Sequence, residues 1–169
     1  QWSYNTREQV ASTTYPGEWS ALTVNAGGRA HIAHAEILYG GGHVYFLGSR
    51  ALVRAVGGEV MLEDVTLGAS AWSAVYSENG WVLVRDSRME DNAWNVWNET
   101  PKHVVDARFN WWGDASGPHH PTKNPEGLAK DVTDGVLFFP WAVDRDGTVP
   151  TQVTAQGPSR VSPGDTVDY

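Results

Sequence analysis

Apolar residues in the middle of the chain follow a period-two pattern that breaks once and then resumes. In the segment GGEVMLEDVTL, residues 57–67, the apolar positions are Val60, Leu62, Val65 and Leu67. Spacing of two predicts a β-strand, because successive side chains of a strand point to opposite faces. The three-residue step from Leu62 to Val65 reverses inside and outside, so we expect the chain to bend at Glu63-Asp64.

This pattern recurs at intervals of about twenty to thirty residues, in segments 27–37, 57–67, 79–89 and 100–109. The predicted columns are Ile32/Leu62/Val84/Val104, Ala35/Val65/Ser87/Ala107 and Ile37/Leu67/Met89/Phe109, with a further strand carrying Val53, Val75 and Val96. Short strands that repeat in this way predict a coil of stacked parallel strands, since one turn alone cannot bury its apolar face. An antiparallel sandwich is the alternative, and the column alignment argues against it.

Composition narrows the classes of function. The 169 residues are enough for one sizeable core, and the net charge of -8 with only 12 scattered Lys and Arg argues against a nucleic-acid partner. No apolar run approaches the roughly 20 residues of a membrane span, so no membrane insertion is expected. The absence of cysteine excludes disulfides and thiolate metal sites. Nine Trp and 18 Gly indicate tight turns and a supply of flat aromatic faces.

Two segments give the chain a family resemblance. GEWSALTVNAGGRAHIAHAEILYGG (17–41) resembles the first rung of secreted bacterial right-handed parallel β-helix proteins, of the pectate-lyase-like superfold. FNWWGDASGP together with NPEGLAKDVTDGVLFFPWA, within 109–142, resembles the segment that closes such proteins. The resemblance implies an all-β, right-handed parallel β-helix of about four to five rungs with a C-terminal cap, secreted or on a cell surface.

The same resemblance suggests how the chain is divided. Residues 1–16 are expected to be an N-terminal extension or part of a preceding rung, and 17–143 the β-helix. Residues 144–169 are expected to be a linker and the truncated start of an immunoglobulin-like repeat, because GPSRVSPGDTVDY resembles the first strands of one. We therefore expect a fragment of a longer multidomain protein. Its N-terminal rung is expected to self-associate unless residues 1–16 cover it.

A closing turn is predicted at residues 110–118. Trp111 and Trp112 are expected to cover the open apolar end of the coil, with Asp114 and Gly117-Pro118 as turn residues. The neighbouring pair His119 and His120 is a weak candidate for a metal site, because adjacent residues on a strand face opposite ways and no third ligand is evident.

One column of acidic residues is a candidate metal site. The bend after the first strand is expected to stack His34, Asp64, Asp86 and Asp106. Neighbouring strands lie about 4.8 Å apart, so the carboxylates would repel and calcium would relieve the repulsion. In the alternative, which we favour, each Asp bonds turn amides and stays solvated, with Arg85, Arg88 and Arg108 near enough to neutralise the column. We therefore expect no cofactor and keep calcium as a candidate.

Aromatic columns suggest a carbohydrate partner. Counting outward from the Val53, Val75 and Val96 positions places Arg54, Tyr76 and Trp97 in one outward column, and Trp72 and Trp94 form a second column. Flat aromatic faces stack on sugar rings, and Arg holds hydroxyls or carboxylates in a fork. The alternative is that these rings fill corners or lie beneath loops.

Catalysis is not the favoured function. Polygalacturonase-like enzymes carry Asn-Thr-Asp, Asp-Asp, Gly-His-Gly and Arg-Ile-Lys motifs, of which this chain has only GGHV around His43. Pectate lyases use an Arg as base beside calcium-binding carboxylates, and Arg54 is the one basic residue on its strand. We therefore expect a non-catalytic module that binds polysaccharide or acts as a rigid spacer. The alternatives are a fragment of a polysaccharide lyase or glycoside hydrolase, and the structural cap of a β-helical stalk.

Overall fold

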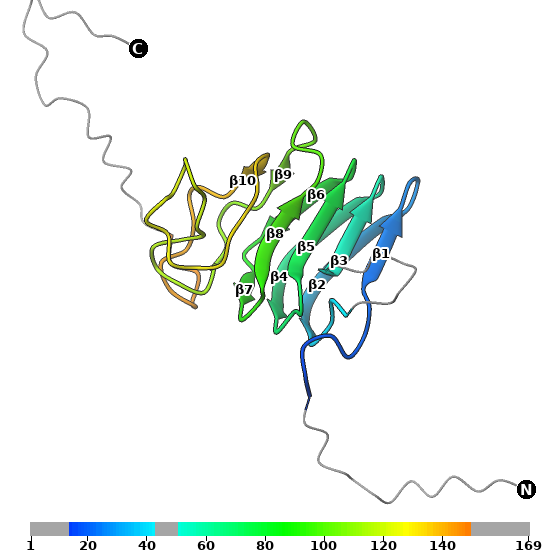
Figure 1. The fold of residues 1–169 in the computed structure, drawn as a ribbon, viewed down its shortest axis with the longest axis horizontal. Coiled ribbons are helices and arrows are strands. Elements are labelled where there is room, and N and C mark those ends of the chain that lie inside the picture. The colour runs from blue at the N-terminus through cyan, green and yellow to red at the C-terminus, as the bar shows by residue number, and fades with distance from the viewer. Residues whose placement is uncertain (1–13, 43–50, 150–169) are drawn as a thin grey trace, which may run out of the picture.

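The computed structural model describes residues 14–42 and 51–149 and arranges them as stacked β-strands (Figure 1). The strands are β1 (Leu22–Asn25), β2 (Arg29–Leu38), β3 (Ala51–Val56), β4 (Glu59–Gly68), β5 (Ser73–Glu78), β6 (Trp81–Arg85), β7 (Arg88–Glu90), β8 (Trp94–Asn98), β9 (Val105–Asp106) and β10 (Val136–Leu137). Within these two ranges no helix is long and apolar enough to cross a membrane. The expectations for His43, for the N-terminal extension up to residue 13 and for 150–169 lie outside the described residues.

The strands form two sheets, and the paired strands of both are parallel. One sheet has the order β1-β3-β5-β8, and the other has the order β2-β4-β6-β9-β10, with β7 also paired to β4. From β1 to β6 the chain alternates between the two sheets, and from β3 onward each strand lies beside an earlier strand of its own sheet (Figure 1). The predicted all-β class with parallel strands is therefore confirmed.

The register of the first three repeats agrees with the predicted columns. Ile32 pairs with Leu62 and Leu62 with Val84, and in the other sheet Val53 pairs with Val75 and Val75 with Val96. The predicted bend is present as well, because His34, Asp64 and Asp86 have φ values of 52°, 50° and 49°. Asp and His are among the residues that adopt this left-handed conformation more readily than most. The bend lets apolar side chains on both of its sides face the interior.

The predicted alignment of the fourth repeat is wrong by three residues. Val104 was expected beside Val84, but Val105 pairs with Val82 and Asp106 with Leu83, so Ala107 takes the place beside Val84 and Val104 is 47% exposed. Further along, Trp111 lies beside Arg88, so Asn110 and Trp112 occupy the positions that were assigned to Ala107 and Phe109. The sequence offers several apolar residues within four positions, and stacking on β6 decides which of them face the interior. Phe109, with a φ of 65°, is at the bend instead.

The closing turn, residues 110–118, contains the residues that were predicted to cap the coil. Trp112 is buried in the core beyond Met89, whereas Trp111 is half-buried. Asp114 is a turn residue, since its Oδ1 accepts hydrogen bonds from the Ser116 amide at 2.8 Å and the Ser116 hydroxyl at 2.6 Å. These bonds hold the pKa of Asp114 below its usual value. After this turn, the segment expected to close the coil forms one short strand, β10.

A buried polar ladder supports the bend from inside. The Val65 amide donates to Ser87 Oγ at 3.0 Å, and the Ser87 amide donates to Asn110 Oδ1 at 2.9 Å. The Asn110 side-chain amide donates in turn to the carbonyls of Val84 at 2.9 Å and Ala107 at 2.8 Å. A bend interrupts the regular exchange of backbone hydrogen bonds, and buried backbone groups need partners. The ladder supplies those partners.

Replacing Asn110 with Ala should therefore be costly. Asn110→Ala leaves several buried backbone groups unsatisfied, at about 1–3 kcal/mol for each such group, so we expect the free energy of unfolding to fall by roughly 3 kcal/mol. Urea unfolding followed by tryptophan fluorescence measures the change. Asn25→Ala, at an exposed strand end, is the control and should change stability by less than about 0.5 kcal/mol. Equal effects of the two substitutions would contradict a structural role for the ladder.

Candidate functional site

The predicted column of Arg54, Tyr76 and Trp97 is in register across β3, β5 and β8. It is not an open ladder, however, because Tyr76 is only 8% exposed. The Arg54 guanidinium lies 5.1 Å from the centroid of the Tyr76 ring, a cation–π distance. Burial raises the pKa of Tyr76, and the negative charges of Glu78 and Glu99 raise it further. Arg54 and Tyr76, both predicted to contact carbohydrate, thus contact each other.

The three tryptophans of the predicted columns form one edge-to-face cluster. The ring centroids of Trp72 and Trp97 lie 5.7 Å apart, and those of Trp94 and Trp97 lie 4.9 Å apart. Trp97 Nε1 donates to Glu99 Oε2 at 2.9 Å, which fixes the central ring. Trp72 and Trp94 do not share a register position, since Trp94 pairs with Ser73. Trp94 is at the rim of this cluster.

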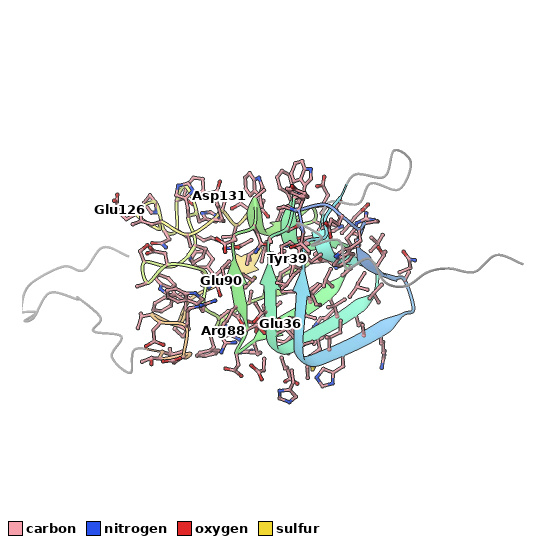
Figure 2. The ribbon with its side chains drawn as sticks, turned by 90° about the horizontal axis from the view of Figure 1, so that it is seen from below. Glu36, Tyr39, Arg88, Glu90, Glu126 and Asp131 are labelled. Atoms are coloured by element: carbon pink, nitrogen blue, oxygen red, sulfur yellow. The ribbon has the colours of Figure 1, made fainter. Side chains whose placement is uncertain are left out.

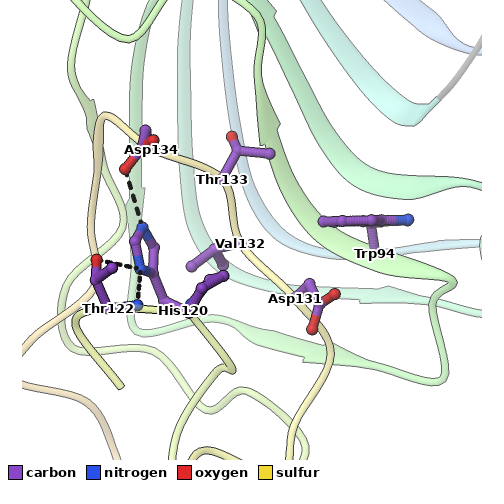
Figure 3. A pocket seen from close by; sticks show the side chains of 8 residues that line it. Trp94, His120, Thr122, Asp131, Val132, Thr133 and Asp134 are labelled. Carbon is purple, nitrogen blue, oxygen red and sulfur yellow. Dashed lines mark hydrogen bonds and ion pairs between the residues drawn. The ribbon is translucent and has the colours of Figure 1, made fainter. Parts of the chain in front are cut away.

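Beside Trp94 the structure has a pocket with a volume of about 330 Å³ (Figure 3). Its lining consists of Trp94, His120, Pro121, Thr122, Asp131, Val132, Thr133 and Asp134. The segment 131–133 is held against β8, because the Asn95 amide donates to the Asp131 carbonyl at 3.0 Å and Val132 forms a parallel bridge with Val96. Of the residues predicted to bind carbohydrate, only Trp94 lines this pocket.

His120 is the most buried polar side chain of the pocket, with 4% of its side chain exposed. Its Nδ1 accepts hydrogen bonds from the amides of Thr122 at 3.3 Å and Lys123 at 3.2 Å. Because an accepting Nδ1 carries no proton, the ring proton must be on Nε2. Among the described residues Nε2 has no hydrogen-bond partner, and the nearest charged group is Asp134, whose Oδ1 lies 3.3 Å away.

His119 and His120 do not act as a pair. His119 Nδ1 lies 2.8 Å from Asp131 Oδ1, whereas His120 packs near the Phe138 ring, with centroids 6.0 Å apart. The two imidazoles therefore have different partners.

The predicted acidic column is only partly assembled. His34, Asp64 and Asp86 occupy the same bend, and His34 Nδ1 lies 2.8 Å from Asp64 Oδ2. Asp106 is not part of the column, because it pairs with Leu83 in β6 and β9. Within residues 14–42 and 51–149 no group of three or more His, Asp or Glu side chains is placed to hold a metal ion. Asp64 and Asp86 instead line a second pocket of about 250 Å³ together with Arg88, Trp111 and Arg145.

Asp106 is engaged by two arginines. Its carboxylate accepts bonds from Arg108 Nε at 2.9 Å, from Arg108 Nη2 at 2.8 Å and from Arg85 Nη2 at 2.9 Å. The hydrogen bonds from Arg108 are the largest cause of its lowered pKa, and the charges of both arginines lower the pKa further. Bidentate arginine geometry is the strong form of such a contact.

Replacing Asp106 should make stability depend less on pH. A carboxyl group whose pKa is lower in the folded state stabilises the fold above its unfolded pKa, and this contribution is lost as the pH falls through the folded value. We expect Asp106→Asn to reduce the free energy of unfolding by about 1 kcal/mol near neutral pH, a figure reduced for partial exposure. The difference from the parent should shrink below about pH 4. Urea unfolding over a pH series measures it, with Asp86→Asn as control, and a pH-independent difference would contradict the ion-pair account.

Comparison of the chain with protein-family models, with curated protein sequences and with solved structures finds no match. What the protein binds must therefore be inferred from its own side chains and their geometry.

Proposed function

We propose that the chain is a non-catalytic, right-handed parallel β-helix module of a secreted or cell-surface protein, and that it binds carbohydrate in the pocket beside Trp94. The β-helix is supported by the alternation of the chain between two parallel sheets and by the continuous columns across them. Parallel strands that stack turn upon turn are the repeat of such a solenoid. Secretion is supported by the family resemblance of residues 17–41 and 109–142.

The position of Trp94 is the observation that carries the binding proposal. Its half-buried ring stands at one end of a pocket of about 330 Å³, a volume at the lower end of the range typical of ligand sites. The other walls carry hydroxyl, carboxylate and imidazole groups from Thr122, Asp131 and His120. A sugar ring needs an apolar platform for its C–H face and polar groups for its hydroxyls. The pocket has both the apolar platform and the polar groups among its lining residues.

Hydrolysis is the second candidate, because Asp131 and Asp134 line the same pocket. Glycoside hydrolases use two carboxyl groups, one of which must act as an acid. The environment of these two side chains favours binding over acid catalysis. Asp131 is bonded to His119, and the Asp134 side chain is 76% exposed to solvent.

Substitution of Trp94 tests the binding proposal. We expect Trp94→Ala to weaken retention on the preferred polysaccharide at least about fivefold, since aromatic contacts contribute on the order of 1 kcal/mol beyond the area they bury. Trp94→Phe should keep part of the binding. Affinity electrophoresis over a panel of soluble plant and microbial polysaccharides, with and without calcium, measures retention, and an assay for reducing or unsaturated ends detects turnover.

Trp81→Ala is the matched control, because Trp81 is 50% exposed on the outer face of the other sheet. This variant should bind like the parent. Thermal unfolding of each variant shows whether weaker binding comes from loss of the Trp94 contact or from loss of the folded structure. Release of new ends from any polysaccharide would contradict the non-catalytic proposal, and equal retention by the Trp94 and Trp81 variants would contradict the site.

A further inference from the structure

The pocket beside Trp94 is lined by two acidic side chains whose basic neighbours are imidazoles, His119 beside Asp131 at 2.8 Å and His120 beside Asp134 at 3.3 Å. Asp131 and Asp134 both line it, and its other lining residues include no Lys or Arg. In Figure 3, Asp131 lies on the side of Trp94 and Asp134 on the side of His120, so carboxylates flank the space at both ends. Protein recognition of a sugar carboxylate commonly uses the planar fork of Arg. Arg54, the arginine that the sequence analysis predicted to hold a sugar hydroxyl or carboxylate, lies over the Tyr76 ring instead and does not line this pocket.

The buried imidazole of His120 places a separate requirement on the ligand, a hydrogen-bond acceptor. His120 Nε2 carries the ring proton, because both backbone amides donate to Nδ1. Asp134 Oδ1 lies 3.3 Å from it without forming a hydrogen bond, so this donor is left without a well-aligned acceptor although the ring is almost fully buried. A buried donor without an acceptor is destabilising, and an incoming hydroxyl oxygen would satisfy it. The ligand is therefore expected to offer a hydrogen-bond acceptor at this end of the pocket.

Trp94 also favours positive charge. The face of an indole ring attracts a cation, at about 0.5–2 kcal/mol depending on exposure. An ammonium group near Trp94 would lie close to the Asp131 carboxylate as well, so ring and carboxylate would act on the same group (Figure 3). The net charge of -8 adds a long-range attraction for cationic polymers and opposes anionic polymers.

We infer that the pocket selects amine-bearing sugar units, with the amine at Asp131 and Trp94 and a hydroxyl accepting from His120, and that it discriminates against uronates. This inference rests on the proposed carbohydrate-binding function and names the substrate class of the same site. A sugar with a free amine has all the required parts in one ring: a flat C–H face, an ammonium group and hydroxyl acceptors. A uronate would bring its carboxylate next to Asp131 or Asp134.

Titration calorimetry on the full chain tests the inference with three oligomers of matched length: glucosamine, N-acetylglucosamine and galacturonic acid. The titration is run at about pH 5.5, where the glucosamine amines are largely protonated. We expect the glucosamine oligomer to bind at least about tenfold more tightly than either of the others, which corresponds to about 1.4 kcal/mol. Its affinity should also fall with added salt, because the contact is between charges near the surface.

Charge-neutral variants identify the residues responsible. Asp131→Asn should weaken glucosamine binding several-fold and reduce its preference over the acetylated oligomer, and Asp134→Asn should do so to a smaller degree because it is more exposed. Glu36→Gln is the control, because it removes the same charge from an exposed site on the opposite side of the molecule from Asp131 (Figure 2). It should leave the preference unchanged.

The possible failures are distinguishable. If none of the three oligomers binds and the polysaccharide panel gives no retention, the proposed function fails and the inference fails with it. If the acetylated or uronate oligomer binds as tightly as glucosamine, or if Asp131→Asn behaves like Glu36→Gln, carbohydrate binding stands and the inference about charge is overturned.

Discussion

In-register stacking of parallel strands is the constraint on which the rest of this structure depends. Each strand of a sheet satisfies the backbone groups of its neighbour, so a shift by one residue would turn every interior side chain outward. The column Val60, Val82, Val105 and Val136 is buried in four successive strands because the register is kept across them. The same register fixes the outer face. The packing of the interior therefore decides which side chains face outward, where they can contact solvent or a ligand.

The bend shows how the chain can change direction under this constraint and keep apolar side chains in the interior. A strand that alternates strictly cannot turn a corner and keep apolar residues on the inside. The left-handed residue at the bend changes the phase, and Ser87 and Asn110 supply the hydrogen bonds that the regular ladder loses there. Polar residues in the core are thus part of the repeat. They explain why the interior column of Ala35 and Val65 continues with Ser87 and Asn110.

The sequence predicted the class of fold, the bend and three of the four aligned repeats, because those features are encoded in local periodicity. It failed at the fourth repeat because Val104, Val105 and Ala107 are all apolar, and only contact with β6 shows that Ala107, not Val104, lies beside Val84. It placed Trp94 on the outer face but missed the rest of the pocket. His120, Asp131 and Asp134 belong to a segment of isolated bridges and turns, in which no periodicity indicates what the side chains face.

The position of the pocket follows from the way the stack ends. β8 is the last strand of its sheet, and an uncovered edge strand invites pairing with other chains. Residues 131–133 cover this edge through the bridge of Val132 with Val96 and the bond from the Thr133 amide to the Val96 carbonyl at 3.2 Å. Because the covering segment is irregular, it leaves a hollow beside Trp94 that another regular strand would have filled. Protection of the edge and formation of the candidate site are therefore two consequences of one element.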